Sequence, residues 1–222
     1  VEAIQQPKTW RLIKAINGDS REAKEMVFVI HGILQDKSLP PLNMKPKTVP
    51  SRYRFLKQGV TITGLDTPTF SDSIKSATEI YGLFDWNFAE GRMELWSCVN
   101  RTPNECDSIH ASNRYLMLKM EATHQPFKKL VDPKGILKAM AKESYVHTED
   151  NDVLYTKCKT QAEGKFFYKE IGPQAFQIGD IVEIQVLFVV VPLKDEKVKM
   201  IMVLQSITLL EAWSKVKRKT DK

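Results

Sequence analysis

The sequence predicts a mainly β, β-rich α+β fold: an antiparallel barrel or sandwich with two or three short helices. Stretches in which apolar and polar residues alternate recur between Gly, Pro, Asn and Asp residues, which is the pattern of half-buried strands. Apolar residues make up 42% of the 222 residues and charged residues 27%, the composition of a folded domain. Strand-like segments continue on both sides of a basic, proline-rich loop at 37–50, so we expect a single domain over residues 1–222.

The two longest predicted strands form a hairpin near the end of the chain. A charged turn after Pro192 separates them, and each arm has roughly a dozen residues, more than the usual five or six. Arms of this length favour a bent sandwich or a barrel. In chain order, the expected strands are Thr9–Lys14, Glu25–Leu34, Arg52–Thr63, Gly91–Val99, Asn113–Ala122, Val153–Cys158, Lys165–Ile171, Gly179–Val191 and Lys197–Leu210.

Helices are expected at two places in the middle of the chain. The first follows the capping residues Ser71–Ser73 and runs to Leu83, with apolar residues at helical spacing. The second begins at Asp132–Pro133, since proline is tolerated at the first helical position. A third, basic helix is expected over Leu210–Lys222, and residues 213–222 form a basic tail. The second helix carries lysines at every fourth position, namely Lys134, Lys138 and Lys142.

Neither a membrane span nor a secretory signal is expected. The longest apolar run, Val186–Val191, has six residues, whereas a span needs about 20. The first residues, Val1–Gln6, lack the basic and apolar regions of a signal peptide. Three cysteines without metal-type spacing favour a reducing compartment. We therefore expect an intracellular protein, nuclear or cytoplasmic, without a membrane partner.

No motif predicts catalysis, a metal or a cofactor. The cysteines and four scattered histidines match no zinc spacing, and phosphate-binding glycine motifs are absent. Met26–Gly32 resembles the strand and His-Gly turn that precede the oxyanion hole of α/β hydrolases, but the required Gly-x-Ser-x-Gly is missing. We expect a partly buried strand histidine at His31. An enzyme remains an alternative only if a cleft unites His31, His147 and carboxylates.

The net charge of +6 is distributed unevenly along the chain. Lys37–Lys57 holds six basic residues, four prolines and no acid, which favours an extended loop or arm. Residues 128–142 and 213–222 each carry +4. Each Lys or Arg that neutralises a phosphate of a nucleic acid releases counterions. The arm, the lysine-bearing helix and the tail therefore suit a polyanion.

Aromatic residues lie among the basic ones. On a strand, Arg52–Phe55 places two guanidinium groups on one face and two rings on the other. Such rings can stack on unpaired bases, or they can belong to the core. We therefore expect a nucleic-acid-binding module, with single-stranded DNA or RNA favoured. The candidate binding residues are Arg52, Arg54 and Lys57 for phosphates, Tyr53 or Trp10 for stacking, Lys134, Lys138 and Lys142 as a second contact line, and Lys45 and Lys47 on the arm.

The alternative is a non-catalytic interaction or self-assembly module. In this hypothesis an exposed apolar surface along Val186–Val191 lets the long hairpin pair with a partner or with a second copy, forming a homodimer.

The segment from Lys134 to Leu210 resembles uncharacterised proteins encoded in many copies by mushroom-forming fungi. The resemblance rests on Phe176–Val186, Val189–Leu193, Lys199-Met200, Val203–Ile207 and Tyr145–Asn151. It implies no activity and no catalytic residue; multicopy occurrence suits a passenger of mobile DNA, and hence a nucleic-acid role. Gly179-Asp180 before a long apolar strand is also similar to the opening strand of small barrels, including oligonucleotide-binding ones.

Overall fold

The computed structural model confirms a mainly β, β-rich α+β fold. It describes residues 1–5, 8–14, 24–98, 106–119, 124–141, 144–160 and 165–211. The strands are β1 (Glu2–Gln5), β2 (Lys8–Arg11), β3 (Ile13–Lys14), β4 (Lys24–Glu25), β5 (Phe28–Ser38), β6 (Lys57–Thr63), β7 (Met93–Glu94), β8 (Ser108–Arg114), β9 (Met117–Leu118), β10 (Tyr145–Val146), β11 (Leu154–Thr160), β12 (Phe166–Glu170), β13 (Ile181–Pro192) and β14 (Val198–Glu211). The helices are α1 (Pro68–Asp85) and α2 (Ile136–Ala141), with 3-10 turns η1 (Pro50–Phe55), η2 (Glu149–Asn151) and η3 (Pro173–Ala175).

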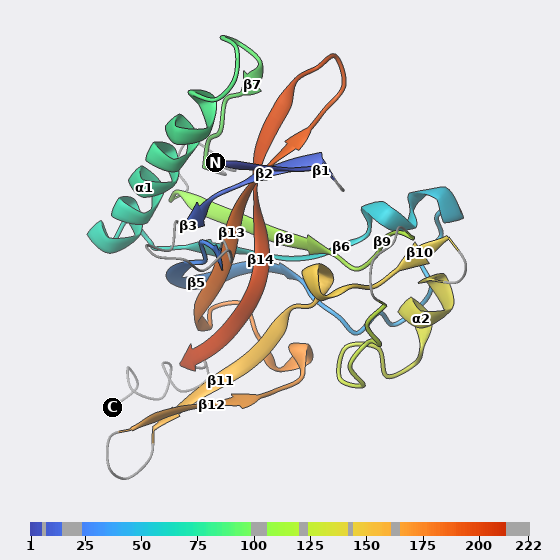
Figure 1. The fold of residues 1–222 in the computed structure, drawn as a ribbon. Coiled ribbons are helices and arrows are strands. Elements are labelled where there is room, and N and C mark those ends of the chain that lie inside the picture. Colours follow the sequence, from blue (N-terminus) through green and yellow to red (C-terminus); the bar gives the residue numbers. More distant parts are fainter. Residues whose placement is uncertain are drawn as a thin grey trace, which may run out of the picture.

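One large sheet dominates the described part of the chain, in the order β12-β11-β14-β13-β5-β6-β8, with β1, β2 and β7 attached to it. The expected long hairpin is present as β13 and β14, which run through the middle of the molecule (Figure 1). The sheet is not wholly antiparallel, because β14 pairs in parallel with β11 and with β7. No ladder among the described residues joins β8 to β12, so the sheet is not a closed barrel.

Extra residues in two strands bend this sheet. Relative to its partner, β14 has one extra residue at Gln205 and another at Leu210, and β5 has one at Gln35. Such bulges increase the local twist and redirect a strand. Close to the first bulge, the Asn113 side chain of β8 donates hydrogen bonds to the carbonyls of Leu204 (3.0 Å) and Asp150 (2.8 Å). The sheet thus curls until β8 lies beside β14, although the two share no ladder.

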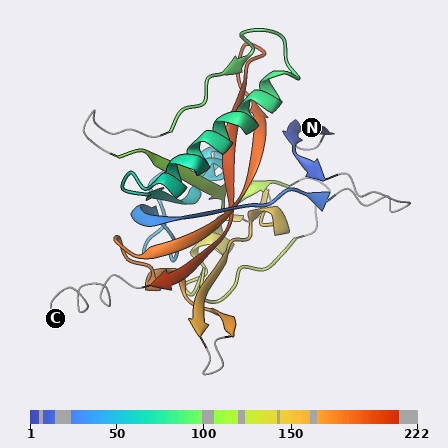
Figure 2. The same cartoon turned by 90° about the vertical axis from the view of Figure 1, so that its left-hand side faces the viewer.

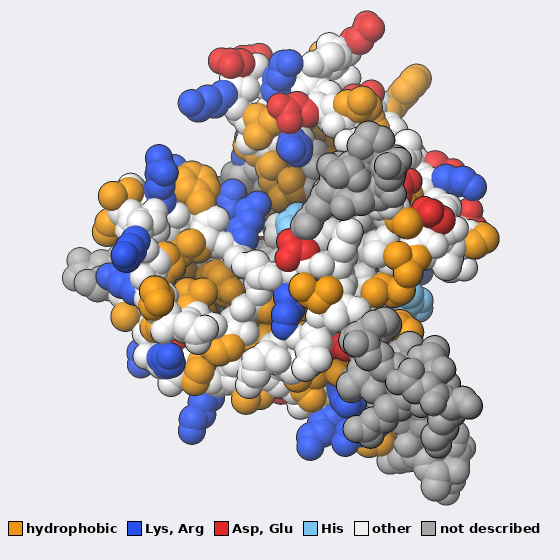
Figure 3. Space-filling view, turned by 180° about the vertical axis from the view of Figure 1, so that it is seen from behind, with side chains coloured by type: hydrophobic (Ala, Val, Ile, Leu, Met, Phe, Trp, Pro, Cys, Tyr) orange, Lys and Arg blue, Asp and Glu red, His pale blue; other side chains and the backbone are white. Residues whose placement is uncertain are grey.

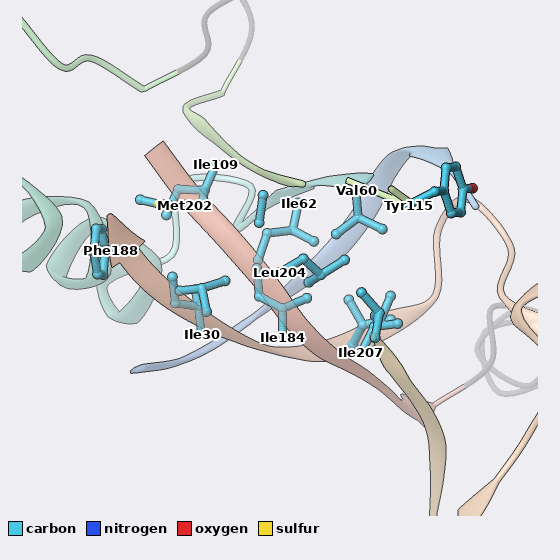
Figure 4. Packing of buried hydrophobic residues seen from close by; sticks show 14 of the residues in the cluster. Ile30, Val60, Ile62, Ile109, Tyr115, Ile184, Phe188, Met202, Leu204 and Ile207 are labelled. Atoms are coloured by element: carbon cyan, nitrogen blue, oxygen red, sulfur yellow. The ribbon is translucent and has the colours of Figure 1, made fainter. Parts of the chain in front are cut away.

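The core fills the inside of this curl. Alternate residues of β6 and β8, such as Ile62 and Ile109, point toward Ile184, Met202 and Leu204 of the hairpin (Figure 4). Ile62, Ile184 and Leu204 have no exposed surface. Burial of a side chain of this size stabilises the fold by about 1.5–3 kcal/mol.

Helix α1 packs on the outside of the sheet, where Figure 2 shows it crossing the strands. Its buried residues are Phe70, Ala77, Ile80 and Phe84, at the three- and four-residue spacing of one helix face. The helix predicted from Ser71–Ser73 to Leu83 is confirmed, and it extends slightly further at both ends. The second predicted helix is also present, as α2, but it begins at Ile136 and has only six residues.

Several predicted elements differ from the structure. Arg52–Phe55 is a 3-10 turn rather than a strand, because Pro50 starts a helical turn and Leu56 bonds back to Tyr53. A strand was expected over Asn113–Ala122, but β8 begins at Ser108 and ends at Arg114. The proline-rich loop starts later than expected, since β5 continues through Ser38. The third predicted helix is wrong at its first two residues, which belong to β14; its remainder and the basic tail lie outside the described residues.

The apolar surface expected along Val186–Val191 is also absent. Val186, Phe188 and Val190 are almost fully buried, and Leu187 and Val189 are less than 10% exposed. In addition, β13 pairs with β14, β5 and β2, so that the hairpin is interior to the sheet rather than a free edge.

Candidate nucleic-acid interface

The site is built on the outer face of β6 and β8. Residues alternate along β6, so that Gln58, Val60 and Ile62 are buried while Lys57 points outward. Arg114 lies directly opposite Lys57 in the antiparallel register. Side chains directly opposite each other on one face are close neighbours, and like charges there destabilise the pair. The fold thus places two cations side by side.

Two further cations complete a group that we call the cationic cluster: Arg54, Lys57, Arg114 and Lys199. Partial burial lowers the pKa of Lys57, and the neighbouring charges of Arg114 and Lys199 lower it further. The pKa of Arg114 is lowered by partial burial and then by Arg54. The contributions of the neighbouring charges show that the four cations repel one another. An anion bound among them would relieve this repulsion.

No member of the cationic cluster forms an ion pair with a carboxylate within the described part of the chain. Glu94 of β7 lies beside Lys199 in the register, but the two side chains make no ion pair. The Arg54 Nε is buried without a hydrogen-bond partner, and the guanidinium carbon lies 4.8 Å from the centre of the exposed Phe55 ring. By contrast, Arg11 on the neighbouring strand β2 pairs with Glu25 and with Asp150.

A groove of about 500 Å³ opens beside Lys57 and Lys199. We call it the Trp96 groove, after the tryptophan that lines it. Its walls combine apolar and hydroxyl-bearing side chains with His110, whose Nδ1 lies 3.1 Å from the Thr61 hydroxyl oxygen. Burial and then the charge of Lys57 lower the pKa of His110, so the imidazole is neutral at pH 7. The lining residues are Ser38, Lys57, Gln58, Gly59, Leu95, Trp96, Ser97, His110, Ser112, Lys199, Met200, Ile201 and Met202.

A smaller hollow of about 120 Å³ adjoins the groove, because Lys57, Ser112 and Ile201 line both. Outward-facing aliphatic residues of the hairpin form its floor, among them Leu187 and Val203. Arg11, Arg114 and the acid Asp150 also line it. Lys57 lines both hollows, Arg114 the smaller one and Lys199 the Trp96 groove, so cations and apolar side chains meet in both, which suits a ligand that is both charged and partly apolar.

A second basic region lies next to the cluster and is formed by the proline-rich arm and α2. The Lys134 Nζ donates to the carbonyl of Asn43 at 3.3 Å, which holds the segment just before α2 against the arm. The side chains of Lys45, Lys47, Arg52 and Lys138 are exposed. Figure 3 shows Lys and Arg side chains along the left of this face with few acids between them. Arg52 and Arg54 share η1, so the two basic regions are continuous.

The predicted stacking residues lie elsewhere. Tyr53 is 5% exposed, and its ring packs near Tyr145 with the Lys45 ammonium 5.7 Å from its centre. It is a core residue, so its ring offers no open stacking surface. Trp10 is half-buried and meets Phe88 edge-on, with ring centres 5.0 Å apart. It lines neither hollow next to the cluster. Lys142 lies outside the described residues.

The structure thus brings Arg54 and Lys57 into the cluster, and Lys45, Lys47, Arg52, Lys134 and Lys138 into the second basic region. Sequence reasoning missed Arg114, Lys199, Trp96 and His110. For His110, Arg114 and Lys199 the only sequence signal is alternation within strands, and Trp96 lies just after β7, outside any strand. Which strands become neighbours depends on long-range pairing that no local pattern reveals.

The residues named for an enzymatic alternative do not meet in any described cleft. His31 is exposed, not partly buried, and its Nε2 lies 3.0 Å from a Glu183 carboxylate oxygen. His147 is buried, and its Nδ1 donates to the Tyr115 carbonyl at 3.0 Å. Within the described ranges, no group of three or more His, Cys, Asp or Glu side chains is placed to hold a metal ion. No helix in these ranges is long and apolar enough to cross a membrane.

Comparison with protein-family models, with curated proteins and with solved structures found no match.

Proposed function

We propose that this protein binds single-stranded nucleic acid along the cationic cluster and the adjoining basic region. The observation that carries the proposal is the cluster itself. Strands β6, β8 and β14 and the turn η1 each contribute one cation, and no described carboxylate pairs with any of them. Repelling cations are costly in the free protein, and a chain of phosphates offers them partners at regular spacing.

Several features favour a single strand over a duplex. Duplex readers commonly place a helix or a two-stranded ribbon in the major groove. Here α2 has six residues, of which Leu137, Met140 and Ala141 are buried. The cations instead border two concave hollows, which suit a flexible strand whose bases are free to turn toward the protein.

The direct test is binding of a labelled 30-nucleotide single strand, followed by fluorescence anisotropy at several salt concentrations. The double variant Lys57→Gln, Arg114→Gln removes two cations of the cluster. We expect it to weaken binding by roughly tenfold at low salt and to reduce the slope of log affinity against log salt by about 1.4, since each contact with a single strand contributes about 0.7.

The matched control is Lys75→Gln, Lys159→Gln, which removes the same charge from α1 and β11, away from both hollows. We expect its affinity and salt slope to stay close to those of the parent protein. Absence of binding by the parent protein at low salt would overturn the proposal. So would equal losses in the two double variants, because the effect would then reflect net charge rather than the cluster.

A further inference from the structure

We propose that the Trp96 groove takes one unpaired nucleobase of the bound strand, with the phosphates on either side of that nucleotide on Lys57 and Lys199. This inference rests on the proposed function and adds to it a subsite for a base. It is carried by the position of Trp96, by the lining of the groove and by the charges that border it.

Trp96 reaches the groove because β7 runs parallel to β14. Met93 lies beside Val198 and Glu94 beside Lys199, so the chain then continues alongside β14, and residues 95–97 line the groove together with residues 199–202. Trp96 is half-buried and packs against the core cluster while still lining the groove. A ring held in this way loses little conformational freedom when a base stacks on it, and such stacking contributes about 1–3 kcal/mol per base.

The rest of the lining matches the chemistry of a base. The half-buried Ile201 provides apolar surface for the face of a heterocycle beside Trp96, whereas Met200 and Met202 also line the groove but are almost fully buried. Three serines and the neutral His110 provide hydrogen-bonding groups for its polar edge. The volume of about 500 Å³ lies within the range of about 300–1,000 Å³ that is usual for small-ligand sites.

Gly59, which lines the groove, lies where β6 and β8 approach each other closely. A Cβ atom there would lie 2.9 Å from the Ala111 carbonyl oxygen and 2.9 Å from the Ser112 Cβ. Glycine therefore allows β6 and β8 to approach closely beneath the groove, and any side chain at this position would disturb that floor.

Charge at the border points to a nucleotide rather than a neutral ring. Lys57 and Lys199 both line the groove, and each lacks an ion-pair partner among the described carboxylates. Two acids lie nearby: Glu94 is beside Lys199 in the register, and the charge of Asp36 acts on His110. Neither of them lines the groove.

The test compares two ten-residue strands with equal numbers of phosphates: oligothymidylate and a fully abasic strand. At one salt concentration we expect the parent protein to bind oligothymidylate at least about fivefold more tightly, the lower end of the stacking contribution. Trp96→Ala should abolish this preference while changing the affinity for the abasic strand by less than about twofold. Trp96→Phe should retain part of the preference.

The matched control is Trp86→Ala. Trp86 is 92% exposed at the end of α1 and lines neither hollow, so its removal should leave the preference unchanged. Equal affinity of the parent protein for the two strands overturns the base subsite but leaves the proposed function standing. Failure to bind either strand overturns the proposed function itself. An equal loss on both strands in Trp96→Ala assigns Trp96 a structural role and also overturns the subsite.

A second measurement needs no variant. A strand carrying one 4-thiothymidine can be photo-crosslinked to the parent protein and the attached peptide mapped. We expect attachment within 95–97 or 200–202. Attachment to the exposed aromatic residues of β12, Phe166–Tyr168, would overturn the assignment.

Discussion

Lys57 occupies a position that lowers the stability of the free protein and that, under the proposed function, would serve binding. Its strand position places it opposite Arg114 and near Lys199. Partial burial lowers its pKa most, and the charges of these two neighbours lower it further. A lowered pKa for a lysine means that the folded protein holds the charged form less favourably than the unfolded chain does. The same lack of counter-charge that destabilises the free protein leaves the ammonium available to a phosphate.

We expect Lys57→Gln to raise the stability of the free protein by up to about 1 kcal/mol at low salt, the scale of interactions between exposed charges. Urea unfolding at 20 mM and 500 mM salt measures the effect, which should shrink as salt screens the repulsion. Lys159→Gln, on an exposed part of β11, is the control and should change little. A variant less stable than the parent at low salt would contradict the repulsion argument.

At the scale of elements, the curl of the sheet depends on contacts that no ladder provides. Asn113 is 5% exposed and joins β8 to β14 and to the turn η2 through its side-chain amide. Because β8 carries Arg114 and His110 toward the hollows, this amide also sets the position of Arg114 relative to Lys199 within the cationic cluster.

Replacing Asn113 with Leu keeps the volume roughly constant but leaves the carbonyls of Leu204 and Asp150 without this donor. A buried polar group without a partner costs about 1–3 kcal/mol, so we expect a loss of unfolding free energy in that range. Urea denaturation measures it. Asn87→Leu is the comparison, because Asn87 also donates to a backbone carbonyl, at 2.7 Å, but from an exposed position two residues after the end of α1. Similar losses in both variants would show that burial is not the cause.

The elements themselves were predictable to different degrees. The alternation in β13 and β14 and the spacing in α1 are strong local signals, and both predictions are confirmed. Arg52–Phe55 also alternates, yet Pro50 starts a 3-10 turn there, and alternation over four residues does not outweigh a proline that favours helical φ. The prediction that Tyr53 and Phe55 share one face failed for this reason: Tyr53 is buried, whereas Phe55 is 53% exposed.

At the scale of the whole molecule, unfolding should depend on pH through His147. Burial lowers the pKa of His147 below its ordinary value of 6.5, although its hydrogen bond to the Tyr115 carbonyl acts in the opposite direction. Below about pH 6.5 the His147 side chain is therefore protonated more readily in the unfolded chain than in the folded protein. The free energy of unfolding must fall as the pH decreases through this window.

Urea unfolding at pH 7.5 and pH 5.5 measures this dependence. We expect a smaller decrease in stability for His147→Gln than for the parent protein. Part of the dependence should remain in the variant, because the pKa of His110 is lowered as well and contributes with the same sign. A decrease of equal size in parent and variant would assign the pH dependence to other groups.

The candidate site was less predictable than the fold. The sequence contains its cations, and Arg54 and Lys57 could be named because they lie in one acid-free segment. Arg114 and Lys199 could not be named, since each belongs to the site only through the register of β6 with β8 and the curl that brings β8 beside β14. Local composition thus identified two of the clustered cations, whereas the geometry of the cluster depends on contacts between distant segments.

The position of β14 has a consequence for synthesis of the protein. Strands β7, β11 and β13 all pair with it, and all of them precede it in the chain. A ribosome therefore releases three strands before the one that joins them has been translated. Until then the edges of these strands that pair with β14 have no partner, and unpaired strand edges make a nascent chain prone to aggregation.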